Sequence, residues 1–214
     1  MSKLNFKGKI VQKIVGEEEP WFYSRQLLKD YSQYIKGKVI DVGGGGGKHK
    51  NFILTISNVE SYTNLDILPS ADKIADLNES LPIKDNSYDT AIFFSAIEYL
   101  REPQMALNEV GRTLRPGSYL LLTAPWLFQP PPIWLGLEYF RFSDKALKYM
   151  LGKAGFQIKQ ILPVGSKKLL LSIFLQNSFP ILRKFRPFLD KWFSPPKKKT
   201  GEDVVYYFVI AKKL

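Results

Sequence analysis

The stretch Asp41-Val42-Gly43-Gly44-Gly45-Gly46-Gly47 decides the fold that the rest of the sequence completes. It ends a short apolar run, Lys38–Val42, and stands before a segment with helical character, Asn51–Ile56. Glycines permit positive φ angles and let the backbone approach a ligand closely. Open α/β sheets bind nucleotides at such a turn between a strand and a helix. The stretch therefore predicts a binding site for a nucleotide-like molecule.

Strand and helix signals alternate along the chain on both sides of this turn, which predicts α/β architecture with a mostly parallel sheet. Tyr88–Ala96 is apolar almost throughout, as a central strand buried on both faces should be. The other predicted strands are Lys38–Val42, Ser61–Ile67, Asp72–Leu77, Tyr119–Thr123, Phe156–Leu162 and Val204–Ala211. Helices are predicted over Pro20–Ile35, from Pro103 to a stop at Arg115-Pro116-Gly117, and from a cap at Ser143 to Gly155.

The 214 residues suit a single domain with an appendage. We divide the chain into an N-terminal helical cap (1–37), a ligand-binding core (38–162), an insertion (163–203) and a last strand (204–214). The insertion is far longer than the usual connection of about 4–6 residues. It is proline-punctuated and rich in leucine and aromatic residues, and its nine basic and three acidic residues give it a net charge of +6.

Two phosphate-binding motifs can be tested against the glycine turn by counting. The dinucleotide pattern G-x-G-x-x-G fails because its third glycine falls on Lys48 or His49. The P-loop pattern fails because it requires a glycine at Val42 and Ser or Thr at His49. The pattern D-x-G-x-G-x-G does fit, at Asp41, Gly43, Gly45 and Gly47. It resembles motif I of class I S-adenosylmethionine-dependent methyltransferases.

The resemblance extends from about Val39 to Leu162 through loosely matching segments in the same order. It implies a Rossmann-like doubly wound sheet, mostly parallel with an antiparallel last strand, and S-adenosylmethionine as the cofactor. The backbone of the glycine turn would pack against the amino-acid tail of this cofactor, and Asp41 would attract its ammonium group or order water there. The subfamily resembled acts on small molecules or glycans.

Further cofactor-binding residues are expected beyond the turn. Asp66, with its neighbour Ile67, ends a strand about twenty residues after the glycines, where a carboxylate can accept hydrogen bonds from both ribose hydroxyls. The resemblance implies that Asp76 accepts from the adenine amino group and that Leu77 packs on the ring. It also implies that Ser95, at the end of the central strand, lines the sulfonium.

Methyl transfer to an acceptor depends mainly on positioning and on exclusion of water, because the sulfonium already activates the methyl carbon. Glu98 and Tyr99 are the candidate catalytic residues, although many relatives carry histidine where Tyr99 stands. Glu138, Tyr139 and Arg141 are candidate substrate residues from a second segment that resembles the family. A structural role remains open for each of them.

The composition excludes several kinds of site. There is no cysteine, so disulfides, thiolate metal sites and cysteine nucleophiles are excluded, and the single histidine, His49, excludes a histidine-rich metal centre. No metal is therefore expected.

The net charge of +11 favours an anionic partner, which keeps an RNA methyltransferase open as an alternative. No RNA-binding module is recognisable, so nucleic acid is the less favoured partner. A non-catalytic S-adenosylmethionine-binding protein is the remaining alternative.

The insertion leaves two partners open. Basic charge together with Leu, Phe and Trp is the composition of helices that lie in a membrane interface. The same apolar groups could instead pack on the domain as a substrate lid or form a homodimer contact. We see no signal peptide and no apolar stretch of the roughly 20 residues that span a bilayer. A cytoplasmic location is expected, with peripheral membrane contact through 163–203 as one alternative.

Overall fold

In the part of the chain that the structure describes, seven strands form one sheet with the order β3-β2-β1-β4-β5-β7-β6. The computed structural model describes residues 21–47, 49–127, 138–165, 171, 174–175, 178–179 and 204–214. The strands are β1 (Lys36–Val42), β2 (Asn58–Asp66), β3 (Lys73–Ile74), β4 (Tyr88–Phe94), β5 (Leu114–Pro125), β6 (Phe156–Val164) and β7 (Tyr206–Lys213). The helices are α2 (Trp21–Asp30), α3 (Lys50–Ile56), α4 (Pro103–Thr113) and α5 (Asp144–Lys153), with 3₁₀ turns η1 (Ser32–Tyr34) and η2 (Ile97–Tyr99).

The sheet is doubly wound, as the sequence predicted. β1 pairs in parallel with β2 on one side and with β4 on the other, and β4 pairs in parallel with β5. β7 is antiparallel to both β5 and β6, which confirms the predicted antiparallel last strand. After β3 the chain crosses back over β1 to form β4, so the strand order reverses between β1 and β4. Ligands of open α/β sheets bind at the carboxyl ends of strands at such a reversal.

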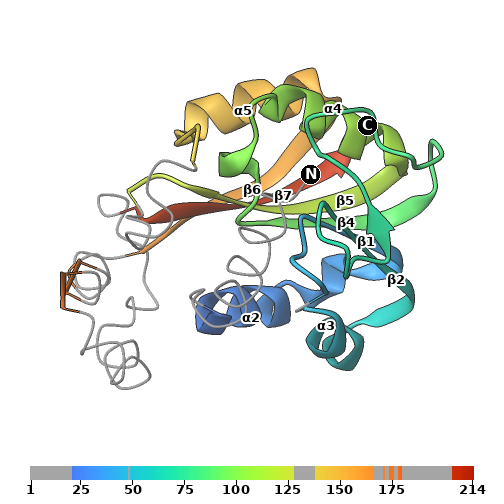
Figure 1. The fold of residues 1–214 in the computed structure, drawn as a ribbon, viewed down its shortest axis with the longest axis horizontal. Coiled ribbons are helices and arrows are strands. Elements are labelled where there is room, and N and C mark those ends of the chain that lie inside the picture. The colour runs from blue at the N-terminus through green and yellow to red at the C-terminus, as the bar shows by residue number, and fades with distance from the viewer. Residues whose placement is uncertain are drawn as a thin grey trace, which may run out of the picture.

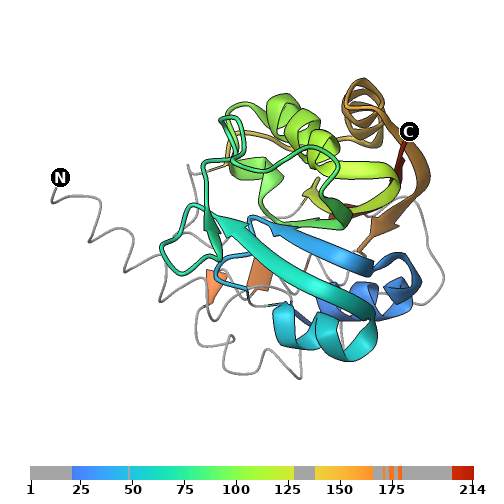
Figure 2. The same ribbon diagram turned by 90° about the vertical axis from the view of Figure 1, so that its right-hand side faces the viewer.

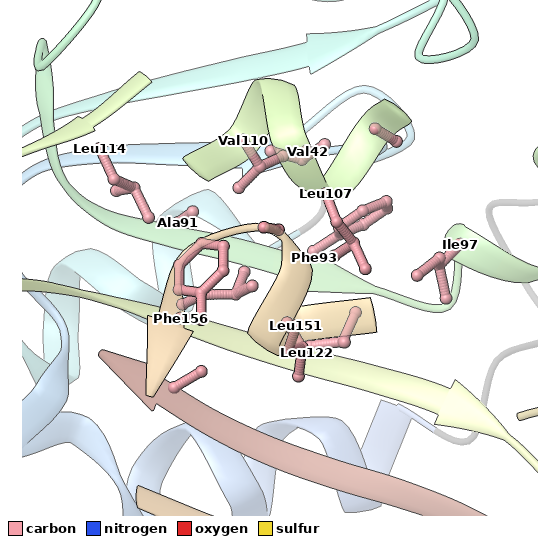
Figure 3. Packing of buried hydrophobic residues seen from close by; sticks show 14 of the residues in the cluster. Val42, Ala91, Phe93, Ile97, Leu107, Val110, Leu114, Leu122, Leu151 and Phe156 are labelled. Carbon is pink, nitrogen blue, oxygen red and sulfur yellow. The ribbon is translucent and has the colours of Figure 1, made fainter. Parts of the chain in front are cut away.

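Helices cover both faces of the sheet (Figure 1), with α4 and α5 on one face and α2 and α3 on the other. The view turned by 90° shows the same division (Figure 2). β4 supplies side chains to both layers, since Phe93 packs in the cluster under α4 and α5 while Ile92 and Phe94 pack in the cluster over α2 and α3. Figure 3 shows Leu107 and Val110 of α4 beside Phe93. The prediction of a central strand buried on both faces is confirmed.

The predicted helix over Pro20–Ile35 was too long at its carboxyl end. α2 ends at Asp30, and a turn at Tyr31 leads into η1. Ile35 is fully buried in the cluster over α2 and α3, and the next residue already starts β1, where the Lys36 N–H donates to Thr90 Oγ1 at 3.1 Å. An α-helix continued to Ile35 would not allow this entry into the sheet. Residues 1–20, and with them part of the predicted N-terminal cap, lie outside the described residues.

Other predicted boundaries also moved. The short strand expected over Asp72–Leu77 is reduced to the two residues of β3, because the backbone turns at Asp76, whose carboxylate accepts from the Asn78 N–H at 2.8 Å. The strand expected over Tyr119–Thr123 runs from Leu114 to Pro125, so α4 ends before the predicted stop at Arg115-Pro116-Gly117. This strand accommodates the three residues through an irregular register near Tyr88 and a positive φ of 86° at Gly117.

The insertion begins and ends at the edge of the sheet where the parallel strands finish. Val164 at the end of β6 accepts a hydrogen bond from the Val205 N–H at 2.9 Å, and Val205 accepts in turn from Trp126, just after β5, at 2.9 Å. Most of the predicted amphipathic insertion, 163–203, lies outside the described residues. Within the described ranges, no helix is both long enough and apolar enough to cross a bilayer.

Candidate cofactor and acceptor site

The glycine turn is held between two neighbouring strand ends at the reversal point. The Gly43 N–H donates to the Leu65 carbonyl at 2.8 Å, which ties the turn to β2. Gly43 has a φ of 68°, and a Cβ added there would lie 2.5 Å from the Cβ of Ala96 and 3.6 Å from Leu77. A side chain at this position would therefore displace the residues that follow β4. The structure thus brings the turn, Leu77 and the Ser95–Ala96 bend together, and their binding of a cofactor stays a prediction.

Two buried polar side chains, Asp41 and Asn64, pack against the backbone of the glycine turn. A Cβ added at Gly44 would lie 2.4 Å from Asn64 Oδ1 and 2.5 Å from Asp41 Oδ2, so the backbone rests directly on these side chains. Asp41 is only 1% exposed and accepts a hydrogen bond from the Tyr62 hydroxyl. Burial, reinforced by Asp41, raises the pKa of Tyr62 far above its usual value, so Tyr62 stays a donor. Contact of Asp41 with a ligand ammonium stays a prediction.

Asp66 faces the glycine turn from the end of β2. Its Oδ2 accepts from the Gly45 N–H at 2.8 Å, and its Oδ1 accepts from the Leu68 N–H at 3.0 Å. Each carboxylate oxygen can accept a second hydrogen bond. The next side chain, Ile67, is 65% exposed. This edge of the sheet thus offers charged acceptors beside an uncovered apolar surface, which suits a ligand with hydroxyl groups and a flat apolar ring.

Asp76 and Leu77 lie in the turn after β3. Oδ1 of Asp76 accepts from both the backbone N–H and the side-chain amide of Asn78, each at 2.8 Å. Asn78 Oδ1 in turn accepts from the Arg101 N–H at 2.8 Å, just before α4. The structure therefore fixes the orientation of Asp76, and its role toward an adenine stays a prediction. Leu77 is buried against Gly43 rather than exposed like Ile67.

The carboxyl end of β4 bends sharply. Ser95 has a φ of 50°, which is unusual for a residue other than glycine, and its N–H donates to Thr123 Oγ1 of β5 at 2.9 Å. The bend leads into η2, which carries Glu98 and Tyr99. Glu98 is 4% exposed, and its carbonyl accepts from the Tyr139 N–H at 2.8 Å. The two groups of residues predicted as catalytic and substrate-binding therefore lie side by side.

The segment 138–142 completes this edge. The carboxylate of Glu138 forms an ion pair with the guanidinium of Arg141, and the Glu138 side chain is 10% exposed against 32% for Arg141. Burial raises the pKa of Glu138, although Arg141 acts in the opposite direction. Tyr139 projects outward and is 60% exposed.

Sequence reasoning missed the residues that support the site from a distance. Tyr62 and Asn64 lie under the glycine turn, and Asn78 links the Asp76 turn to α4. Glu109 and Arg112 of α4 hold the loop that precedes β4, since Glu109 accepts from the Leu81 N–H at 2.7 Å. The only local signal was the polar character of Tyr62 and Asn64 within an otherwise strand-like segment.

Residues 40–122 match a family model described as "Methyltransferase domain". A protein of Oryza sativa subsp. japonica, 2-methyl-6-phytyl-1,4-hydroquinone methyltransferase 1, chloroplastic, is 31% identical over 149 residues, which are 61% of this chain and 44% of that protein. Phthiotriol/phenolphthiotriol dimycocerosates methyltransferase 1 of Mycobacterium ulcerans is 32% identical over 103 residues, which are 42% of this chain and 38% of that protein. The chain thus spans less than half the length of these curated relatives.

A solved structure shares the fold at low sequence identity. Phosphoethanolamine N-methyltransferase 2 of Haemonchus contortus, in complex with S-adenosyl-L-methionine, gives a TM-score of 0.62 at 15% identity, covering 90% of this chain and 52% of that one. The family match includes the glycine turn, Asp66, Asp76 and Ser95, and the seven-stranded sheet has the reversal expected for the fold in the described part of the chain. Residues 40–122 thus match a methyltransferase domain, and the described part of the chain has the class I, Rossmann-like methyltransferase fold.

Proposed function

We propose that this chain binds S-adenosylmethionine and transfers its methyl group to a small-molecule or glycan acceptor. The observation that carries the proposal is the hydrogen bond between Asp66 and the Gly45 N–H, with Ile67 exposed beside it, at the point where the strand order reverses. This hydrogen bond joins the glycine turn to the carboxylate at the end of β2, the two features that we expect to contact the nucleoside part of the cofactor.

The residues present fit this cofactor. Gly43 lies so close to the side chain of Ala96 that a Cβ would not fit, so the turn presents bare backbone beside the end of β4, where an amino-acid tail would lie. Asp66 has spare acceptor capacity for ribose hydroxyls. Asp41, Gly43, Gly45, Gly47 and Asp66 would hold the tail and ribose, and Ile67, Asp76, Leu77 and Ser95 the base and sulfonium.

S-adenosylmethionine supplies a methyl carbon that is activated by the attached positive sulfur. The chain's own residues then have to orient the acceptor and keep water away. The Ser95 bend is fixed to β5 through Thr123, and η2 is fixed to the segment after it through Glu98 and Tyr139. We assign acceptor positioning to Glu98 and Tyr99 on this ground, and acceptor contact to Glu138, Tyr139 and Arg141.

Two observations support the proposed acceptor class. The curated relatives are named for 2-methyl-6-phytyl-1,4-hydroquinone and for phthiotriol/phenolphthiotriol dimycocerosates, and neither name refers to a nucleic acid. The carboxyl edge of this chain carries exposed Trp126, Leu127, Tyr139 and Phe140, which suits an acceptor with an apolar part. An RNA acceptor is the alternative that the net charge of +11 favours.

Ligand-induced stabilisation tests the proposal. S-adenosylmethionine and S-adenosylhomocysteine should raise the melting temperature, because a ligand that binds only the folded state stabilises it. NAD and ATP should leave it unchanged. Transfer of labelled methyl groups into a small-molecule extract, compared with total RNA, then separates the two acceptor classes. Stabilisation by NAD without stabilisation by either methionine-derived ligand would refute the assignment.

A further inference from the structure

The segment 138–142 is anchored to both strand ends that bound the acceptor side of the site. The Tyr139 N–H donates to the Glu98 carbonyl at 2.8 Å, after β4, and the Phe142 N–H donates to the Pro125 carbonyl at 2.9 Å, at the end of β5. The backbone on both sides of the Glu138–Arg141 ion pair is therefore fixed. The same bend after β4 contacts the glycine turn through Ala96 and Gly43, so cofactor side and acceptor side meet there.

In this segment, one hydrogen-bond acceptor atom and one donor atom are buried without a partner among the described residues. The ion pair joins Oε2 of Glu138 to Nη2 of Arg141. Oε1 of Glu138 and Nη1 of Arg141 are both buried, and neither has a hydrogen-bond partner among the described residues. Burying a polar atom without a partner destabilises the folded state, and more so if the atom is charged. Such atoms in a native fold call for a ligand or water that pairs with them.

A hydroxyl group matches this pair of atoms, because it donates one hydrogen bond and accepts others. It can donate to Oε1 of Glu138 and accept from Nη1 of Arg141. A carboxylate or phosphate ligand offers no donor for Oε1, and an ammonium offers no acceptor for Nη1.

We propose that Glu138 and Arg141 bind the acceptor's hydroxyl group and that Glu138 takes its proton during methyl transfer. The inference rests on the proposed function. The hydroxyl oxygen forms a bond to the methyl carbon of S-adenosylmethionine, the carbon–sulfur bond breaks with its electron pair remaining on sulfur, and the hydroxyl proton passes to Oε1 of Glu138. The products are a methyl ether, S-adenosylhomocysteine and a protonated Glu138.

The surroundings of Glu138 favour this role. Burial raises its pKa, which makes the carboxylate a stronger base than an exposed glutamate, while Arg141 acts in the opposite direction and favours the ionised form. Arg141 therefore serves two purposes: it contacts the hydroxyl oxygen and it sets the working pH of Glu138.

The test uses the full chain with two hydroxyl probes, hydroquinone as a phenol and octyl glucoside as a sugar. Transfer of labelled methyl from S-adenosylmethionine is measured against pH, and S-adenosylhomocysteine affinity is measured by calorimetry. In the wild type, kcat should fall as the pH drops through the pKa of Glu138, because only its carboxylate form accepts the proton. Glu138→Gln should remove this fall of kcat at low pH, which is the acidic limb of the pH profile. It should also lower kcat by about 10²–10⁴-fold, the usual contribution of a general base. Its affinity for S-adenosylhomocysteine should be unchanged.

Variants of Arg141 separate its two roles from a merely structural one. Arg141→Gln should move the acidic limb to higher pH, because the positive charge that lowers the pKa of Glu138 is gone. Arg141→Lys keeps the charge and should leave the limb close to its wild-type position. The matched control is Glu60→Gln, an exposed glutamate on β2, which should change neither rate nor pH profile.

Each remaining outcome counts against the inference in a distinguishable way. A wild-type chain that binds S-adenosylhomocysteine but methylates neither probe overturns the hydroxyl assignment and leaves the proposed function standing. The same holds if Glu138→Gln retains wild-type kcat and pH profile, which would mean that water alone occupies the two buried atoms. A wild-type chain that fails to bind S-adenosylhomocysteine overturns the proposed function, and the inference with it.

Discussion

The carboxylate of Asp66 accepts a hydrogen bond of 2.8 Å from the backbone N–H of Gly45, although 21 residues separate them in the sequence. This contact joins the end of β2 to the glycine turn after β1. Gly45 has a φ of 56°, so its N–H orientation depends on a backbone conformation that glycine adopts without strain. Asp66 therefore orders the turn in addition to offering its remaining acceptor capacity to a ligand.

The two contributions of Asp66 can be separated by Asp66→Asn. Asparagine keeps one oxygen that can accept from Gly45 but loses the charge and one acceptor. We expect a modest fall in the melting temperature without ligand, because the Leu68 N–H loses its acceptor, while S-adenosylhomocysteine affinity falls about 10–100-fold, since hydrogen bonds to charged groups are worth about 1.5–3 kcal/mol. Calorimetric titration of both proteins checks this. Unchanged affinity would remove Asp66 from the cofactor site.

Gly43→Ala should disrupt the turn itself. Its Cβ would lie 2.5 Å from the Cβ of Ala96, in a backbone conformation that disfavours side chains. We expect loss of S-adenosylhomocysteine binding together with lower stability in urea unfolding. The matched control is Gly152→Ala on α5, where an added Cβ meets nothing within 4 Å. That change should stabilise the chain by up to about 1 kcal/mol, because alanine is the better helix former. Equal effects of the two variants would contradict the role given to Gly43.

Local sequence chemistry indicated the glycine turn and a mostly parallel sheet, while the family resemblance implied the antiparallel last strand. A glycine run between an apolar strand and a helix has few physical solutions, and the apolar β4 residues Ile92, Phe93 and Phe94 fill both faces of a central strand. The carboxylate at the end of β2 followed from the chemistry of nucleoside binding. These features depend on neighbours in sequence, which is why they could be predicted.

The supporting contacts could not be predicted, because they join distant residues through side-chain orientation. Nothing local indicates that Tyr62 would donate to Asp41 across two strands, or that Asn78 would hold the residues before α4. The end of α2 at Asp30 depends on burial of Ile35 in the core, which outweighs the local preference for a longer helix. Likewise, the pairing of Glu138 with Arg141 was not apparent from either residue alone.

Substitution of Glu98 or Tyr99 should affect catalysis more than cofactor binding. Both residues lie in η2, on the side that contacts segment 138–142 through the Glu98 carbonyl. We expect Tyr99→Phe and Glu98→Gln to lower kcat with any methylated acceptor while S-adenosylhomocysteine affinity stays within about twofold, that is within about 0.4 kcal/mol. Steady-state rates and calorimetry test this. A variant that mainly loses cofactor affinity would place that residue in the cofactor pocket instead.

Glu109 should make the free energy of unfolding of the chain depend on pH in the acidic range. Hydrogen bonds from Arg112, and from the Leu81 N–H and Ser80 hydroxyl, lower the pKa of Glu109 to about 2 from its ordinary 4.5. Because the folded-state pKa is the lower one, the stabilisation is complete above about pH 4.5 and is lost as the pH falls toward 2. Urea unfolding against pH should show this loss.

Removing the carboxylate charge tests the assignment of that acid dependence. Glu109→Gln should cost about 2 kcal/mol near neutral pH, within the range for hydrogen bonds to charged groups, and should flatten the dependence between pH 4.5 and 2. Glu60→Gln, whose side chain is 65% exposed, serves as control and should stay within about 0.5 kcal/mol of wild type. An undiminished acid dependence in Glu109→Gln would assign it to other carboxylates.

The last prediction concerns the insertion, which leaves and rejoins the sheet at the edge that carries the proposed site. Its described residues Leu171, Phe174 and Phe179 are each at least 50% exposed, and residues 163–203 carry a net charge of +6. We expect salt-sensitive sedimentation with phosphatidylglycerol vesicles and none with phosphatidylcholine vesicles, because each basic residue near an anionic surface contributes about 1 kcal/mol. Changing Lys197, Lys198 and Lys199 to glutamate should abolish it, whereas the same change at the exposed α5 lysines Lys145, Lys148 and Lys153 should not. A chain that ignores both vesicle types but dimerises with rising concentration, and loses the dimer when 166–203 is deleted, would show that these apolar groups serve self-association instead.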